Sequence, residues 1–188
     1  MAKPSPPRLR VRPRPPVLRL HRLRDGFPCL HRHSGSRLAF AAAVCLEDRR
    51  HAQGVMLSVR GNFEEELALR WPATSDQVRR EWGDSQEATE NGAVGVAILL
   101  IASLTDYHIV HRSYKNTGID YWLGLKEDRL FQQAARLEVS GIRRGDNKQI
   151  DARVNTKLKQ TERSERSGLP VFVVVVEFGE PVAVVVKK

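Results

Sequence analysis

The feature of the sequence that most restricts its possible folds is an uninterrupted apolar run, Val171–Val176. A run of this length, in which five of the six residues are valine, is typical of a strand that is covered on both faces of a sheet. A second valine-rich segment, Val182–Val186, follows after a turn at Gly179–Pro181. Such strands need apolar layers above and below them, so we expect an α/β fold with a mixed central β-sheet flanked by helices.

The segment Ser85–Thr105 is expected to be the principal helix of this fold. Asp84 is a suitable N-cap, and an acid three residues later completes the pattern of a capping box. The second half of the helix, Ala93–Ala102, is apolar on all sides, which is typical of a helix buried inside a small domain. Gly92 and Gly95 lower its intrinsic helix propensity, so we expect them to allow close packing on the sheet.

Two further helices are predicted. Asp146 is a suitable N-cap for a helix from about Asn147 to Arg163, and this helix would form a right-handed crossover between two parallel strands. Upstream, apolar residues recur every four positions from Phe63 to Trp71, which predicts a short helix over Glu64–Trp71.

Two predicted strands between the longer helices each carry one carboxylate. Asp120 lies in Ile119–Leu123 and Glu138 lies in Ala135–Ser140, each on the face opposite to the apolar residues of its strand. The polar connection at Lys126–Asp128 predicts antiparallel pairing, in which directly opposed side chains lie about 5 Å apart and like charges repel. A shared Mg²⁺ or Mn²⁺ ion would remove that repulsion. The alternative is a pair of solvated acids on the polar face of a half-exposed sheet.

Glu90 is a third acid of interest. It aligns with Val94, Ala97 and Ile101, the stripe of the first long helix that we expect to be buried. A carboxylate in that position needs an ion-pair partner, a hydrogen bond or a metal ion. The alternative is an ordinary acid near the N-terminus of the helix.

The charge of the chain is unevenly distributed. Residues 1–53 contain 12 Lys and Arg against 3 Asp and Glu, which accounts for the whole net charge of +9. Because this region lacks a periodic apolar face, we expect residues 1–53 to be a disordered basic segment and residues 54–188 to form one α/β domain. Other readings of the basic segment are an arm that binds nucleic acid, a transit peptide, or leader sequence upstream of a start at Val55 or Met56.

Two classes of site are not expected in the globular part. Residues 54–188 contain no cysteine, which excludes a disulfide or a cysteine-ligated metal ion within them. The longest apolar run, Gly92–Ile101, is far shorter than the ~20 residues that span a bilayer, so we expect no membrane insertion and a cytoplasmic location.

In its order of elements and acids the chain resembles the PD-(D/E)XK nuclease superfamily, whose restriction-endonuclease-like core is helix, three strands, helix, strand (αβββαβ). The resemblance covers about Ser85–Phe178. It implies that Glu90 matches the acid of the first helix, Asp120 the metal-binding acid of the second strand, and Glu138 the acid of the (D/E)-x-K tripeptide. It also implies that Asp120 and Glu138 hold Mg²⁺ or Mn²⁺, which activates a water molecule for hydrolysis of a phosphodiester.

Ser140 departs from the family pattern, which usually has lysine at the third position of the tripeptide. Some family members recruit the cation from another element, and Lys115, Lys157 or Arg136 would serve here. The alternative is that the site is inactive and that the fold is retained for binding.

Three functional classes follow from these patterns. The first is Mg²⁺-dependent hydrolysis of nucleic acid, the second is an inactive nuclease-fold protein that binds nucleic acid or a protein partner, and the third is an unrelated α/β domain whose carboxylates are surface charges. The candidate metal ligands are Asp120 and Glu138. The candidate catalytic residues are Glu90, Lys115, Asp120, Glu138, Ser140 and Lys157.

Overall fold

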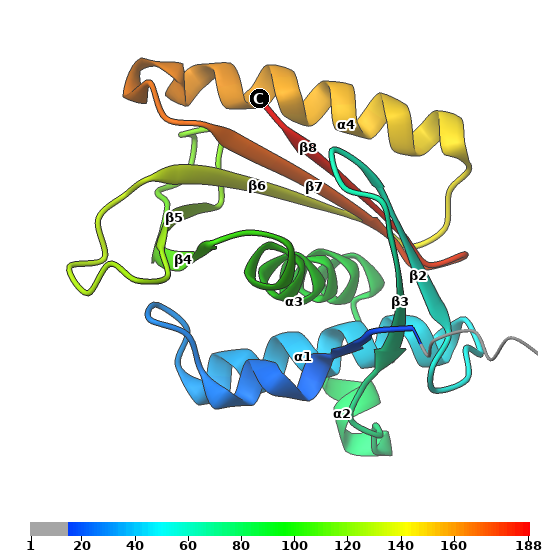
Figure 1. Ribbon diagram of the computed structural model, residues 1–188. Coiled ribbons are helices and arrows are strands. Elements are labelled where there is room, and N and C mark those ends of the chain that lie inside the picture. The colour runs from blue at the N-terminus through cyan, green and yellow to red at the C-terminus, as the bar shows by residue number, and fades with distance from the viewer. Residues whose placement is uncertain (1–14) are drawn as a thin grey trace, which may run out of the picture.

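The computed structural model describes residues 15–188, and its central feature is an eight-stranded mixed sheet in the order β1-β3-β2-β8-β7-β6-β5-β4 (Figure 1). The strands are β1 (Val17–Arg19), β2 (Met56–Gly61), β3 (Glu65–Arg70), β4 (Tyr107–Arg112), β5 (Tyr121–Leu125), β6 (Ala135–Ile142), β7 (Val171–Glu177) and β8 (Val182–Lys187). The α-helices are α1 (Arg32–Asp48), α2 (Asp76–Glu81), α3 (Ser85–Leu104) and α4 (Asn147–Thr161), and the 3₁₀ helices are η1 (Leu20–Asp25) and η2 (Glu162–Ser167).

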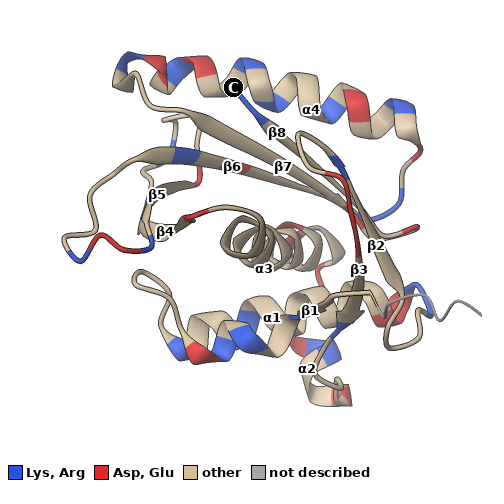
Figure 2. Cartoon of the chain, in the orientation of Figure 1, with Lys and Arg blue, Asp and Glu red and all other residues tan. Residues whose placement is uncertain are grey.

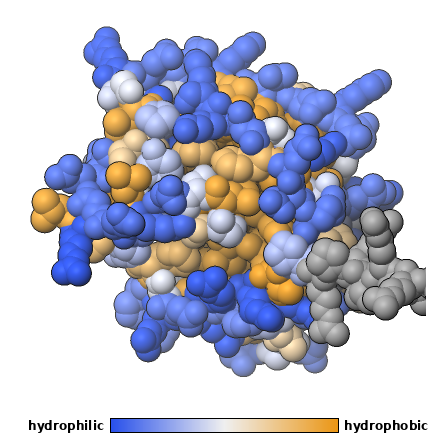
Figure 3. All heavy atoms as spheres, viewed as in Figure 1, coloured by the Kyte–Doolittle hydropathy of each residue, from blue (hydrophilic) through white to orange (hydrophobic). Residues whose placement is uncertain are grey.

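Different helices cover the two faces of the sheet. α4 lies on one face and α3 on the other, and α1 packs against α3 on the side away from the sheet (Figure 1). Charged residues gather on the helices and loops, while the central strand β7 is almost free of them (Figure 2). Seen from the same side, apolar side chains fill the space between the layers and hydrophilic side chains surround them (Figure 3). The predicted mixed sheet flanked by helices is therefore confirmed.

Strand β7 shows why the valine run needs cover on both faces. All of its residues are buried. Val174 and Val176 pack into the larger core with α1 and α3, whereas Val173 and Val175 pack into the smaller core beneath α4. β7 pairs parallel with β6, to which α4 connects it, and antiparallel with β8. The predicted crossover between two parallel strands through a helix is therefore confirmed.

Glycines set the spacing between α3 and its neighbours. A Cβ atom at Gly92 would lie 2.9 Å from the Cα atom of Ala42, so this glycine allows close packing of α3 on α1, and not on the sheet as predicted. The contact between α3 and the sheet depends on Gly141 of β6, where a Cβ atom would lie 2.4 Å from the carbonyl oxygen of Thr89. By length and composition alone α3 could cross a membrane, but 61 % of its most apolar window is buried inside the protein.

Residues 15–53 belong to the fold, so the prediction of a disordered segment over residues 1–53 is wrong for this part; residues 1–14 lie outside the described residues. β1 pairs parallel with β3, and Leu20 and Leu23 of η1 are fully buried. Four of the nine buried residues of α1 are alanines, Ala39 and Ala41–Ala43. Small side chains give a weak periodic signal in the sequence, but they allow two helix backbones to approach closely.

The segment Glu64–Trp71 was predicted as a helix, and this prediction is wrong. The structure places β3 here, antiparallel to β2. Leu67, Leu69 and Trp71 are buried. Apolar residues four positions apart lie on one face of a strand as well as on one face of a helix, so the spacing alone did not decide between them.

Candidate functional site

The site begins where strand β5 stops pairing with strand β6. β5 is paired only with Ala135–Leu137, although β6 continues to Ile142. The next residue pair of this ladder would place Asp120 opposite Glu138. Asp120 Oδ2 accepts the backbone N–H of Val139 at 2.8 Å, which satisfies a donor that no strand pairs with on this side. The Asp120 carboxylate is therefore held at the open edge of β6.

Glu138 lies on β6 with its side chain only 2 % exposed, on the sheet face that α4 covers. The ammonium of Lys157 on α4 donates to Glu138 Oε1 at 2.6 Å and lies 3.3 Å from Gln160 Oε1. A buried carboxylate needs such a partner, because an unpaired buried charge is strongly unfavourable.

The environment of Glu138 favours its protonated form. Burial is the largest cause, and the charge of Asp120 together with a hydrogen bond to its carboxyl group adds to it, whereas Lys157 acts in the opposite direction. Together these effects raise the pKa of Glu138 from 4.5 to about 7. The two carboxyl groups are thus close enough to compete for a proton. A cation bound by both carboxylates could take the place of that proton.

A second contact joins β6 to α4 at Ser140, two residues after Glu138. Arg153 Nη1 donates to Ser140 Oγ at 2.9 Å. Arg153 and Lys157 are four residues apart and so project from one side of α4, while Glu138 and Ser140 are two apart on one face of β6. The helix therefore presents two cations to the side chains of Glu138 and Ser140.

A cavity of about 300 Å³ lies between α3, the end of β4, β6 and α4; Asp120, Ser140 and the two cations of α4 line it, whereas Glu138 does not. The lining residues are Glu90, Asn91, Val94, Arg112, Asp120, Val139, Ser140, Gly141, Arg153 and Lys157. Glu90 reaches this cavity but is exposed, and its Oε1 accepts a hydrogen bond from Gln86 Nε2 at 3.0 Å. The prediction that Glu90 shares the buried stripe of its helix is therefore wrong, since α3 is turned so that this side chain faces the cavity.

Two of the predicted cations lie elsewhere. Lys115 is exposed in the turn between β4 and β5 and does not line the cavity. Arg136 is buried, and its guanidinium donates to the carbonyl oxygen of Leu169 and to Ser164 Oγ near the C-terminal end of α4. Desolvation lowers the pKa of Arg136. Its contacts tie together the connections around α4, which is a structural role.

Sequence reasoning missed two cations of the cavity, Arg112 and Arg153. The position of Arg153 was predictable from the sequence, because it precedes Lys157 by one helical turn and therefore lies on the same side of α4. The position of Arg112 was not predictable from the sequence, since it depends on where β4 ends beside α3.

The carboxylates available here would suit a metal site with two protein ligands, Asp120 and Glu138. Within residues 15–188, no group of three or more His, Cys, Asp or Glu side chains is arranged to hold a metal ion. Mg²⁺ commonly binds one or two carboxylates and completes its shell with water and phosphate oxygens, so Asp120 and Glu138 alone fit this pattern.

No protein-family model matches this chain, and no curated protein or solved structure is significantly similar to it.

Proposed function

We propose that the protein is a divergent PD-(D/E)XK nuclease with a restriction-endonuclease-like core, which hydrolyses phosphodiester bonds of nucleic acid with Mg²⁺ or Mn²⁺. The observation that carries the proposal is the group formed by Asp120, Glu138 and Lys157 at the open edge of β6. The order α3, β4, β5, β6, α4, β7 supports it, because this is the αβββαβ order of the family.

In this proposal α4 supplies the cation that the tripeptide lacks. Ser140 stands at the family's lysine position, and Lys157 reaches Glu138 from the helix at 2.6 Å. Arg153 binds the Ser140 hydroxyl, so the side chain at position 140 serves to hold an arginine beside the cavity. Lysine and arginine at this place can stabilise negative charge that develops on a phosphoryl group.

The remaining residues of the proposed site have separate tasks. Asp120 and Glu138 would hold the metal ion, which when bound polarises the phosphate and lowers the pKa of a water ligand. The Val139 N–H fixes the orientation of Asp120. Arg112 and Arg153 line the cavity and favour the entry of a phosphate. Glu90 faces the same cavity and is available to orient water.

One observation favours the alternative, a nuclease-fold protein that binds nucleic acid or a protein partner without cleaving it. Lys157 and Glu138 already form a close buried ion pair, which satisfies both groups in the absence of metal. If this pair persists when metal and nucleic acid are present, Lys157 is not free to contact the phosphate.

The test is cleavage of DNA and RNA, supercoiled and single-stranded, by the full chain with Mg²⁺, Mn²⁺ or EDTA. Asp120→Asn and Lys157→Met should each lower the metal-dependent rate by about a hundredfold or more. Lys159→Met is the matched control, because it removes the same charge from an exposed position of α4 outside the cavity lining. Activity that survives Asp120→Asn would overturn the proposed site. Stabilisation by metal with no cleavage of any substrate would favour the binding protein.

A further inference from the structure

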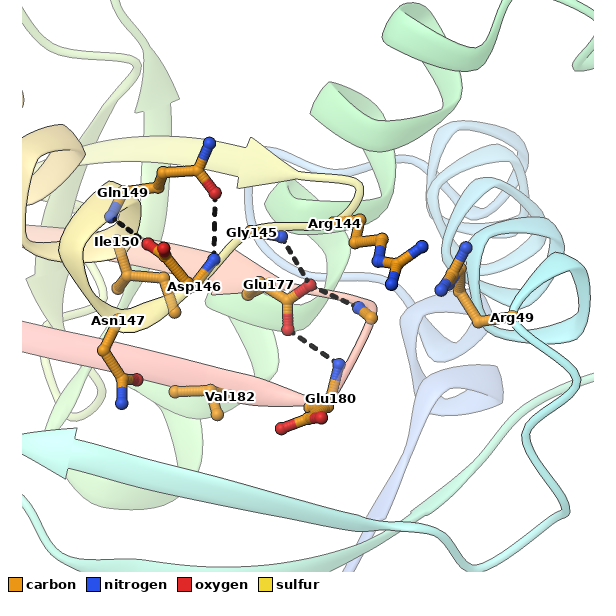
Figure 4. A pocket seen from close by; sticks show the side chains of 11 residues that line it. Arg49, Arg144, Gly145, Asp146, Asn147, Gln149, Ile150, Glu177, Glu180 and Val182 are labelled. Atoms are coloured by element: carbon orange, nitrogen blue, oxygen red, sulfur yellow. Dashed lines mark hydrogen bonds between the residues drawn. The ribbon is translucent and has the colours of Figure 1, made fainter.

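A second cavity, of about 540 Å³, opens on another part of the molecule. It is formed where α1 ends, where β6 passes into α4, and where β7 turns into β8 (Figure 4). It shares no lining residue with the candidate site on the edge of β6.

A buried carboxylate makes the frame of this cavity rigid. Glu177 is 1 % exposed, and its Oε1 accepts the backbone N–H groups of Gly145 and Gly179 while Oε2 accepts that of Glu180 at 2.8 Å (Figure 4). One side chain thus joins the loop before α4 to the β7–β8 turn. At the end of α1, His51 Nε2 lies 2.9 Å from the carbonyl oxygen of Phe178, which fixes the third segment to the same turn.

Two arginines project into this frame without partners. Asp48 and Arg143 form an ion pair that links the end of α1 to the end of β6. The next residues along both segments, Arg49 and Arg144, form no ion pair or side-chain hydrogen bond within residues 15–188, and the Nε atom of Arg49 is buried without an acceptor. In Figure 4 the two side chains extend toward each other at one end of the cavity.

Three acids line the cavity, Asp146, Glu177 and Glu180, and within residues 15–188 none of them forms an ion pair with Arg49 or Arg144. Glu177 is engaged by three backbone donors, and Asp146 caps α4 by accepting the N–H of Gln149 at 2.8 Å. In Figure 4 the carboxylates of Asp146 and Glu180 lie away from the two guanidinium groups, and that of Glu177 is turned toward its backbone donors. Two like charges held face to face repel, and an oxyanion between them removes the repulsion and supplies the missing acceptors.

We propose that this cavity is an oxyanion site that takes a phosphate group, with Arg49 and Arg144 as its ligands. Arginine suits this role because its planar group of N–H donors matches the oxygens of a phosphate. The phosphate group belongs either to a nucleic-acid backbone or to a free phosphate or phosphomonoester. The proposal does not depend on the metal site at β6.

The first test is thermal unfolding of the full chain with inorganic phosphate against chloride at equal ionic strength, with EDTA present. Phosphate at about ten times its dissociation constant should raise the melting temperature by about 3 to 5 °C. Arg49→Gln and Arg144→Gln should each remove this rise, while melting in chloride at or above the temperature of the native protein. Arg129→Gln removes the same charge from an exposed loop outside the cavity and should keep the rise.

The second test identifies the source of the phosphate, by measuring how a labelled single-stranded oligonucleotide binds at several salt concentrations in EDTA. If the backbone is the source, both cavity variants bind more weakly and their salt slope falls by about 0.7 per lost phosphate contact. If binding is unchanged but phosphate still stabilises the native protein, the source is a free phosphate or phosphomonoester. No response to phosphate together with unchanged oligonucleotide binding would overturn the oxyanion site, whether or not the protein cleaves nucleic acid.

Discussion

At the scale of single residues, Glu138 makes its own contribution to the pH dependence of stability. Burial and the charge of Asp120 raise its pKa to about 7, against 4.5 for an ordinary glutamate. Between these values Glu138 is more fully protonated in the folded protein than in the unfolded chain. The free energy of unfolding therefore falls as the pH rises from about 4.5 to about 7, and the contribution of Glu138 is fully present only below this window.

Replacing Glu138 by Gln should remove this dependence. In the absence of metal we expect the native protein to lose about 2 to 3 kcal/mol across the window, and the variant to lose little of that amount. The measurement is urea unfolding at pH values from about 4 to 7.5 with EDTA, a range that contains the expected window. Glu127→Gln, at an exposed position of the β5–β6 loop, is the control for a change of charge alone. Equal slopes in all three proteins would contradict the raised pKa of Glu138.

The same pair of acids predicts linkage to metal. Mg²⁺ or Mn²⁺ at 100 times its dissociation constant should stabilise the folded protein by about 2.7 kcal/mol. The gain should grow as the pH rises through about 7, because metal binding requires ionised Glu138. Asp120→Asn should abolish the gain yet leave the metal-free protein about as stable, since asparagine still accepts the Val139 N–H. Thermal unfolding with and without metal measures this.

The control for that experiment is Glu90→Gln. Glu90 lines the cavity, but no third acid completes a metal site within residues 15–188, so this variant should keep most of the gain. A loss as large as that of Asp120→Asn would show that Glu90 is a ligand. If metal leaves the melting temperature of the native protein unchanged, the cation site at Asp120 and Glu138 is wrong.

The sequence contained enough information to bring Asp120 and Glu138 together, because strand periodicity and one antiparallel pairing fix their relation. It also pointed to Lys157 as a cation on the following helix. It did not separate Lys115 from Lys157, since whether a loop lysine reaches a site depends on the path of the turn. Nor did it place Glu90, whose direction depends on how α3 is rotated about its axis against the sheet.

At the scale of the elements, the α1–α3 contact is the feature that sequence patterns described least well. The helix at Ser85–Leu104 and the buried strand β7 were recognisable from capping and from apolar runs. The neighbour of α3 was not, because alanines in α1 resemble an unpatterned segment while they allow close packing. A similar ambiguity affected β3, where buried residues fit both a helical and a strand period.

The contact between α1 and α3 makes a prediction about Gly92. Alanine is normally about 1 kcal/mol better than glycine inside a helix. Here a Cβ atom would lie 2.9 Å from the backbone of Ala42, so Gly92→Ala should destabilise the protein by about 1 to 3 kcal/mol. Gly95→Ala is the comparison and should cost less, because a Cβ atom there would lie 3.1 Å from Leu23 Cδ1 and 3.2 Å from the Cβ atom and carbonyl oxygen of Leu38, so no neighbour is closer than 3.0 Å. Urea unfolding that shows Gly92→Ala to be the more stable variant would contradict the α1–α3 packing.

At the scale of the whole molecule, the sheet is completed and covered by segments from both ends of the described chain. β1 and α1 come from residues 15–53, while β7 and β8 come from the last residues. The sequence analysis assigned these regions to different parts of the protein, since the first is rich in arginine and proline. In the structure they pack together in one fold. Charge and proline content report what a segment exposes, whereas the fold depends on the few apolar and small residues that it buries.

The hypothesis that synthesis starts at Val55 or Met56 predicts that a chain beginning at Met56 folds by itself. The structure leads to the opposite expectation. Removing α1 and η1 uncovers α3 and deletes four buried leucines, Leu20, Leu23, Leu38 and Leu46.

Each buried leucine is worth about 1.5 to 3 kcal/mol, so the loss is about 6 to 12 kcal/mol, as large as the whole stability of a typical domain. The chain beginning at Met56 should therefore show no cooperative unfolding and should expose apolar surface. A chain beginning at Pro15 keeps every described contact and is the control. Circular dichroism and urea unfolding of both chains decide the question, and a cooperative transition of the shorter chain within a few degrees of the control would show that α1 is not part of the folding unit.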